Sequence, residues 1–188
     1  APLFSSATII LLLVIPLLTM RLISEERRSR TLPLLFSAPV SMTEIVLGKY
    51  LGILGFLAIM LGLITLMPLS LLSLGTLDFG LLASILLGMV LMLAAFAAAG
   101  LFMSTLTAQP TVAAVSTFGL LLLLWIIELT GQSAAEGNSV FAYLSLQRHY
   151  EALLRGLFNS SDILYYLLFI ATFLVLGIRR LDADRLQH

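Results

Sequence analysis

The sequence contains no cysteine and very little charge. Its 188 residues include 10 lysine and arginine residues, 10 aspartate and glutamate residues and two histidines. The missing cysteines exclude disulfides, thiolate metal sites and a cysteine nucleophile. The formal net charge of zero argues against a nucleic-acid partner, because such a partner calls for a basic surface.

Common enzyme motifs are also absent from the sequence. No G-x-x-x-x-G-K-[ST] occurs, since Gly48-Lys49 is followed by Tyr50 and Thr43 stands in the place of the first glycine. The sequence has no H-E-x-x-H, no G-x-S-x-G and no Rossmann glycine pattern. The chain is therefore not expected to hydrolyse ATP, to bind a cofactor or metal, or to act as an enzyme by itself.

Apolar residues dominate what is present. Hydrophobic residues make up 60% of the chain and charged residues 11%, with a mean hydropathy of +1.10, whereas soluble domains carry about 25% charged residues. The sequence therefore predicts an all-α, polytopic membrane helical bundle that forms one transmembrane domain over residues 1–188. A membrane-spanning helix needs about 20 mostly apolar residues. Five segments qualify or nearly qualify: residues 2–20, 50–74, 79–103, 112–129 and 163–178.

The lysine and arginine residues predict the orientation, because cytoplasmic loops carry an excess of them. If the junction after the first span faces the cytoplasm, eight of the ten basic residues lie inside and only Arg148 and Arg155 lie outside. Five spans that end inside place the N-terminus of this chain outside and its C-terminus in the cytoplasm. An outside start without a basic leader segment suggests a further span before residue 1.

Two pairs of small residues have a spacing that allows close helix packing in lipid. Gly48 and Gly52 form a GxxxG pattern, and Ala95 and Ala99 are separated in the same way. Such pairs let two helix backbones approach each other, although ordinary membrane composition also produces them.

Charge is concentrated at the junction between the first two predicted spans. Six of the 20 charged residues lie within ten positions there: Arg21, Glu25, Glu26, Arg27, Arg28 and Arg30. A positive-inside anchor explains the arginines, with the glutamates as their solvated partners. It does not explain the short apolar stretch that follows.

That stretch, residues 31–38, predicts a short apolar helix. Thr31 is a suitable N-cap, Pro33 is tolerated in the first turn, and Pro39 disfavours helical geometry at the residue before it. Residues 41–44 match a capping box and are expected to begin a new helix that continues into the second span. A short inside helix with exposed apolar side chains suits a groove on a partner or the membrane surface.

The largest outside region contains an amphipathic segment, residues 141–158. Its apolar side chains recur at helical spacings of three and four, and its charged side chains form the opposite stripe. The candidate residues of an outside gate are Tyr143, Leu146, Arg148, Tyr150, Glu151, Leu153 and Arg155. The segment is expected to lie in the outer interface or to dip into it, either as a stabilising cap or as a gate over an exit path.

The junction also allows an enzymatic interpretation. Glu25, Glu26 and Arg30 match the E-E-x-x-x-R pattern of intramembrane CAAX-type proteases. Those enzymes also need histidines on neighbouring spans, whereas the two histidines here are His149, outside, and His188, at the tail. The protease is therefore the weakest of the alternatives.

The stretch EERRSRTLPLLFSAPVSMTEIVLGKYLG closely resembles a motif of ABC-2 type transporter permeases, which often reads E-E-K/R-R-x-G-T-L-E-L-L-L-x-[SA]-P-V-x-x-x-E-I-V-x-G-K. GLFMSTLTAQPTVAA is similar to the family's later inside turn. The C-terminal region resembles the branch that includes gliding-motility and nitrous-oxide-reductase-maturation permeases. The chain departs from the motif at Arg30, where a glycine is common, and at Pro33, where a glutamate is common. Because the family has six spans, the resemblance implies that this chain begins at the second.

The resemblance implies a permease subunit of the bacterial inner membrane that forms a homodimer or heterodimer and binds cytoplasmic ABC ATPase subunits. ATP and Mg²⁺ would bind to the ATPase, and transport or force transmission would follow from its hydrolysis of ATP. Within the coupling segment, residues 24–44, the implied ATPase-coupling residues are Glu25, Glu26, Arg27, Arg28, Arg30, Thr31, Leu32, Leu34, Leu35, Phe36 and Pro39. A second inside turn would contribute Thr105, Thr107, Gln109 and Pro110. The alternative from another class is a membrane protein that anchors or assembles partners without transport.

Overall fold

A computed structural model describes residues 2–76, 78–133 and 160–186 of the chain, and all regular structure in these ranges is helical. The elements are α1 (Pro2–Thr19), α2 (Ser24–Arg28), α3 (Leu32–Ser37), α4 (Met42–Ser70), the 3₁₀ turn η1 (Leu71–Ser73), α5 (Phe79–Leu106), α6 (Pro110–Ser133) and α9 (Ser160–Leu186). The predicted all-α fold is confirmed. The amphipathic segment at residues 141–158, with its seven gate candidates, lies outside the described residues.

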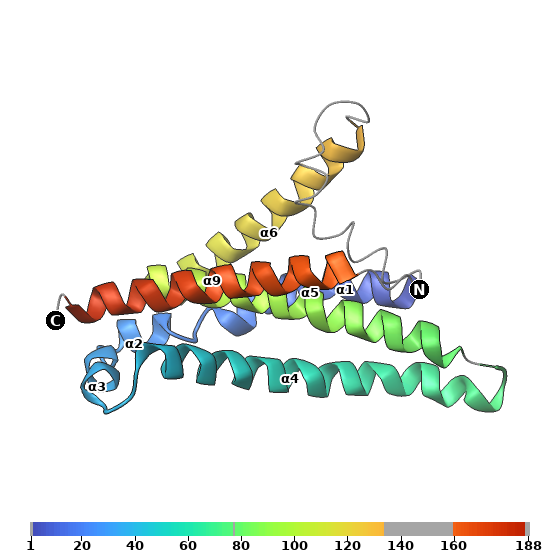
Figure 1. Cartoon of the computed structure of the whole chain (residues 1–188), viewed down its shortest axis with the longest axis horizontal. Helices are drawn as coiled ribbons and strands as arrows, with labels where there is room; N and C mark the ends of the chain where they lie inside the picture. The colour runs from blue at the N-terminus through green and yellow to red at the C-terminus, as the bar shows by residue number, and fades with distance from the viewer. Residues whose placement is uncertain (1, 77, 134–159, 187–188) are drawn as a thin grey trace.

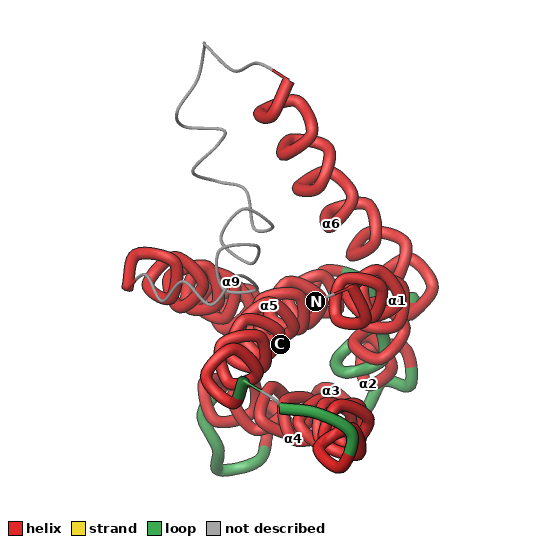
Figure 2. The backbone as a smooth tube through the Cα atoms, turned by 90° about the vertical axis from the view of Figure 1, so that its right-hand side faces the viewer, coloured by secondary structure: helices red, strands yellow, loops and turns green. Residues whose placement is uncertain are grey.

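The long helices lie lengthwise around α5. Helix α5 packs against α1, α4, α6 and α9, and α6 leans away from the other long helices in both views (Figures 1 and 2). The short helices α2 and α3 lie at the same end of the molecule as the C-terminus, whereas the N-terminus and the turn between α4 and α5 lie at the opposite end (Figure 1). We call the end with α2 and α3 the inner end.

Three helices in the described part of the chain are long and apolar enough to cross a membrane: α4, α5 and α9. The chain is therefore a multi-pass membrane protein. Helix α4 begins at Met42, before the predicted span at residue 50, and the predicted capping box at its start is confirmed. The Ser41 hydroxyl accepts from the backbone N–H of Glu44 at 3.2 Å, and the Glu44 carboxylate accepts from the backbone N–H of Ser41 at 3.0 Å.

Helix α5 is the centre of the core, and small side chains bring its neighbours close. Its residues 91–101 are all buried, among them Ala95 and Ala99. A Cβ atom placed on Gly100 would lie only 2.2 Å from Oγ1 of Thr19, so α1 crosses α5 where no side chain fits. By contrast, Gly48 and Gly52 on α4 have nothing within 4 Å of such an added atom. The GxxxG of α4 therefore makes no close helix contact within the part of the chain that the structure describes.

Candidate functional site

The predicted short apolar helix forms at the inner end as α3, Leu32–Ser37. Pro33 lies in its first turn, and the helix ends before Ala38, whose ψ of 149° is extended as expected for a residue that precedes Pro39. Thr31 occupies the N-cap position but its side chain caps no α3 N–H. Its hydroxyl instead donates to the carbonyl oxygen of Glu26 at 3.3 Å.

Helix α3 has one buried and one exposed face. Leu32 and Phe36, one turn apart, are only 6% and 8% exposed. Leu34 is 70% exposed, and Pro33 and Ser37 are exposed with it. The apolar content of α3 is therefore divided between residues that hold the helix on the bundle and one leucine that is free to contact a partner.

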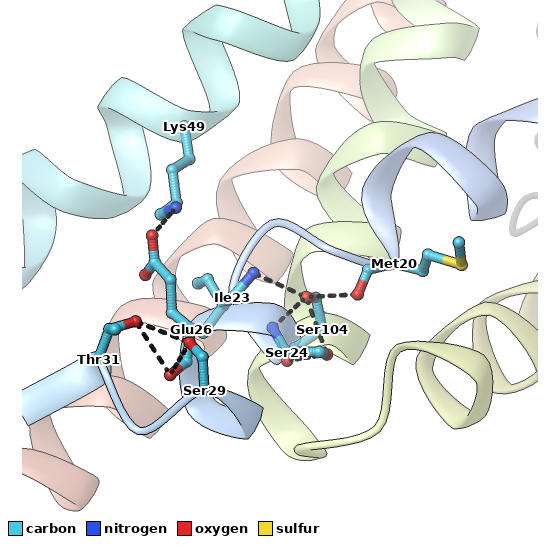
Figure 3. Close-up of polar contacts among 8 residues, drawn as sticks. All are labelled: Met20, Ile23, Ser24, Glu26, Ser29, Thr31, Lys49 and Ser104. Atoms are coloured by element: carbon cyan, nitrogen blue, oxygen red, sulfur yellow. Dashed lines mark hydrogen bonds and ion pairs between the residues drawn. The ribbon is translucent and has the colours of Figure 1, made fainter.

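Helices α2 and α5 cap one another although about 80 residues separate them. The backbone N–H groups of Ile23 and Ser24, at the start of α2, both donate to the Ser104 hydroxyl at 3.0 Å. In return, the Ser24 hydroxyl donates to the Ser104 carbonyl oxygen in the last turn of α5 at 2.9 Å. Figure 3 shows Ser104 between these groups and the carbonyl oxygen of Met20, which its hydroxyl contacts at 3.3 Å. Each serine thus forms hydrogen bonds with backbone groups at the end of the other helix, where such groups have no partner within their own helix.

Arg27 extends this connection to the C-terminal end of α9. Its Nη2 donates to the carbonyl oxygen of Thr105 at 2.7 Å and forms an ion pair with Asp184. Asp184 is 6% exposed, and its second oxygen lies 3.9 Å from the exposed Arg180. One guanidinium therefore joins the inner ends of α2, α5 and α9.

Glu26 connects α2 to α4 and to the start of α3. One oxygen of its carboxylate forms an ion pair with Lys49 at 2.7 Å. Its backbone carbonyl accepts hydrogen bonds from the Thr31 N–H at 2.9 Å and from the Ser29 and Thr31 hydroxyls, each at 3.3 Å (Figure 3). The Glu26 carbonyl oxygen is thus an acceptor for three groups of the turn between α2 and α3, and the carboxylate of the same residue binds α4.

Arg30 has an unusual backbone conformation in this turn. Its φ is +60°, the only positive φ of a non-glycine residue in the part of the chain that the structure describes. A side chain is strained in this left-handed region, and glycine is not. The glycine common at this position in the resembled motif therefore has a conformational reason, which arginine meets at some cost.

We expect Arg30→Gly to raise the stability of the protein by about 0.5 kcal/mol, because the relief of left-handed strain exceeds the extra entropy of an unfolded glycine. The thermal midpoint of the purified protein in detergent measures this. Arg28→Gly is the matched control: Arg28 is also exposed but helical, so its replacement should lower the midpoint. A lower midpoint for both variants would contradict the expectation.

The structure divides the predicted coupling residues into exposed and enclosed groups. Exposed residues are Glu25, Arg28, Arg30, Thr31, Leu34 and Pro39, and Leu35 is half-buried. Leu32 and Phe36 are buried, and the charged groups of Glu26 and Arg27 make ion pairs within the chain. In the second turn Thr105 and Pro110 are buried, Thr107 is half-buried and Gln109 is exposed.

Four residues of the site were absent from the sequence-based set: Ser24, Lys49, Ser104 and Asp184. Ser24 and Ser104 have no local pattern that distinguishes them from other serines. Asp184 offered one weak signal, since it is an acidic residue next to a basic end of a span. Ser24 and Arg27 are 78 or more residues from the groups on α5 that they contact. Such contacts can be recognised only when the packing of the helices is known.

A comparison with protein-family models matches the description "ABC-2 family transporter protein" over residues 4–186. No curated protein and no solved structure matches the chain. The family model includes α2, α3 and the inner ends of α5 and α9, and thus the whole polar site. The resemblance to the gliding-motility and nitrous-oxide-reductase-maturation branch stays a prediction. The chain belongs to the ABC-2 family of transporter proteins and is a permease subunit of an ABC transporter.

Proposed function

We propose that α3 is the coupling helix of this permease and that its exposed face binds a separate cytoplasmic ABC ATPase. The observation that carries the proposal is the two-faced packing of α3. Leu32 and Phe36 fix the helix on the bundle, while Leu34, at 70% exposed, lies on the side turned away from it. An apolar side chain in this position suits a partner's groove.

The exposed charges beside α3 support the same proposal. Glu25, Arg28 and Arg30 are exposed on α2 and on the turn that follows it, four to nine residues before Leu34. An apolar centre with a polar rim is the usual composition of a protein interface. Gln109, exposed in the turn between α5 and α6, is a candidate for the second, smaller contact.

The proposed orientation places the inner end in the cytoplasm of a bacterial cell. The membrane that the long helices cross is then the inner membrane. Helix α2 and the last turns of α9, which lie at this end (Figure 1), carry Arg27, Arg28, Arg179, Arg180 and Arg185, and Lys49 is paired with Glu26 of α2, in agreement with the positive-inside rule. ATP and Mg²⁺ would bind to the ATPase. A second permease subunit, identical or different, would complete the transporter, which moves a substrate or transmits force across the membrane.

We expect Leu34→Ser to weaken binding of the cognate ABC ATPase at least tenfold while the permease remains folded. The reason is that Leu34 is 70% exposed, so its replacement removes mainly area available to a partner. Leu186→Ser is the matched control, because Leu186 is 89% exposed near the end of α9 and lies outside α3. Binding is measured with detergent-solubilised permease and purified ATPase.

A second variant tests the orientation in the same system. The chain has no cysteine, so Leu34→Cys gives a single site for a membrane-impermeant thiol reagent. We expect labelling in inside-out vesicles, slower labelling after the ATPase is added, and none in right-side-out vesicles. Unchanged ATPase affinity of Leu34→Ser would overturn the docking role, and labelling from the outside would overturn the orientation.

A further inference from the structure

We propose that Arg27 and Asp184 are positioning residues that join the C-terminal end of α9 to the coupling segment. A displacement of α2 and α3 would then move α9 together with α5. This inference rests on the proposed function of α3 for its mechanical consequence. The connection itself is a property of this chain and can be tested without a partner.

The contacts of Arg27 single it out among the arginines of the junction. Arg28 and Arg30 are exposed, whereas Arg27 is half-buried and its Nη2 reaches both the Thr105 carbonyl oxygen and the Asp184 carboxylate. The carbonyl belongs to the last turn of α5, where a helix end favours a positive charge. Arg27 therefore belongs at once to the coupling segment and to the ends of two membrane helices.

Asp184 depends on Arg27 more than on its other cationic neighbour. The side chain of Asp184 is 8% exposed, so its charge requires a close partner. Arg180 is 45% exposed and its nearest nitrogen is 3.9 Å from the carboxylate, a distance at which an exposed pair contributes little. Leu181, fully buried on the same helix, places this end of α9 firmly against the bundle.

The length of α9 determines how far a movement at the Arg27–Asp184 contact is transmitted. Helix α9 runs for 27 residues from Ser160 to Leu186, about 40 Å at the rise of an α-helix, and packs along α5 and against α4. Asp184 lies in its last turn. A rigid helix held at this point carries a tilt or shift of the coupling segment along its length, together with α5, against which it packs.

The first experiment uses the full chain alone. Spin labels on Ser37→Cys, in α3, and Ala183→Cys, in α9, report the distance between the two elements, and both positions are exposed. We expect a narrow distance distribution in the parent protein and a distribution at least twice as broad with Arg27→Gln or Asp184→Asn. Arg180→Gln is the matched control and should leave the width unchanged.

Arg27→Lys is the conservative variant, and it should give an intermediate width because lysine keeps the charge but lacks the planar fork. If Arg27→Gln fails to fold, the width measured for Arg27→Lys still tests the proposal. A parent-like width for Arg27→Gln, or equal broadening by Arg180→Gln, would overturn the proposal.

The second experiment adds the ATPase and moves the labels to the opposite end, on Ser73→Cys and Ser160→Cys. In the parent complex, ATP with Mg²⁺ should shift this distance. With the ATPase at saturating concentration, Arg27→Gln should lose at least half of the shift. A full shift in Arg27→Gln would overturn the transmission role. If the parent chain binds no ATPase, the proposed function fails, and the measurement on the chain alone still decides whether Arg27 joins α9 to the segment.

Discussion

Ser104→Ala is expected to destabilise the protein by about 2–4 kcal/mol, although it removes a single oxygen atom. That oxygen accepts the backbone N–H groups of both Ile23 and Ser24, and both residues are fully buried. Alanine would leave two donors without a partner in a site closed to water, and each such donor costs about 1–3 kcal/mol. The main consequence should be loosening of α2 from the end of α5.

Thermal unfolding in detergent measures the effect, and Thr117→Val is the matched control. Thr117 is also fully buried, in α6, and its hydroxyl donates to the carbonyl oxygen of Ala113 one turn earlier. Removal of that hydroxyl leaves no N–H unpaired, so the midpoint should change little. Equal effects of the two substitutions would show that Ser104 is an ordinary core hydroxyl.

A double substitution tests whether the two serines act as one unit. Ser24→Ala removes the hydroxyl that donates to the Ser104 carbonyl oxygen at 2.9 Å. If the helices cap one another, Ser24→Ala combined with Ser104→Ala should cost less than the sum of the single losses. Strict additivity would mean that each serine acts on its own helix.

Gly100→Ala is expected to cost about 1–3 kcal/mol through overpacking. The added Cβ would lie 2.2 Å from Oγ1 and 2.8 Å from Cβ of Thr19, closer than non-bonded atoms approach. Helices α1 and α5 would have to separate. The carbonyl oxygen of Ile15, which accepts a hydrogen bond from the Thr19 hydroxyl at 2.9 Å, would shift with α1. The thermal midpoint and the yield of folded protein should both fall.

The matched control is Gly55→Ala on α4, where nothing lies within 4 Å of the added atom. It should be neutral or slightly stabilising, since alanine favours a helix over glycine. Thr19→Gly, made together with Gly100→Ala, should recover much of the loss because it empties the space that the new methyl group needs. Failure of Thr19→Gly to recover any stability would mean that the clash is not the cause.

The sequence by itself determined the local features of this protein. Pro33 and Pro39 set the limits of α3 because proline fixes φ and restricts the residue before it, and Ser41 with Glu44 set the start of α4. These effects act within a few residues and need no partner. The long apolar runs likewise predicted α4, α5 and α9, the three described helices that are long and apolar enough to cross a membrane, because lipid requires a helix to satisfy its own backbone.

Tertiary structure alone decided which residues of the coupling segment are available to a partner. Leu32, Leu34 and Phe36 are equally apolar in the sequence, but packing buries two of them and exposes the third. Glu26 and Arg27 lie beside Glu25 and Arg28 in the same charged run, yet Lys49 and Asp184 bind the first two within the chain. Asp184 is 157 residues from Arg27. A charge that leaves water must find an opposite charge nearby, and only the packing of α2 against α4, α5 and α9 fixes which one it finds.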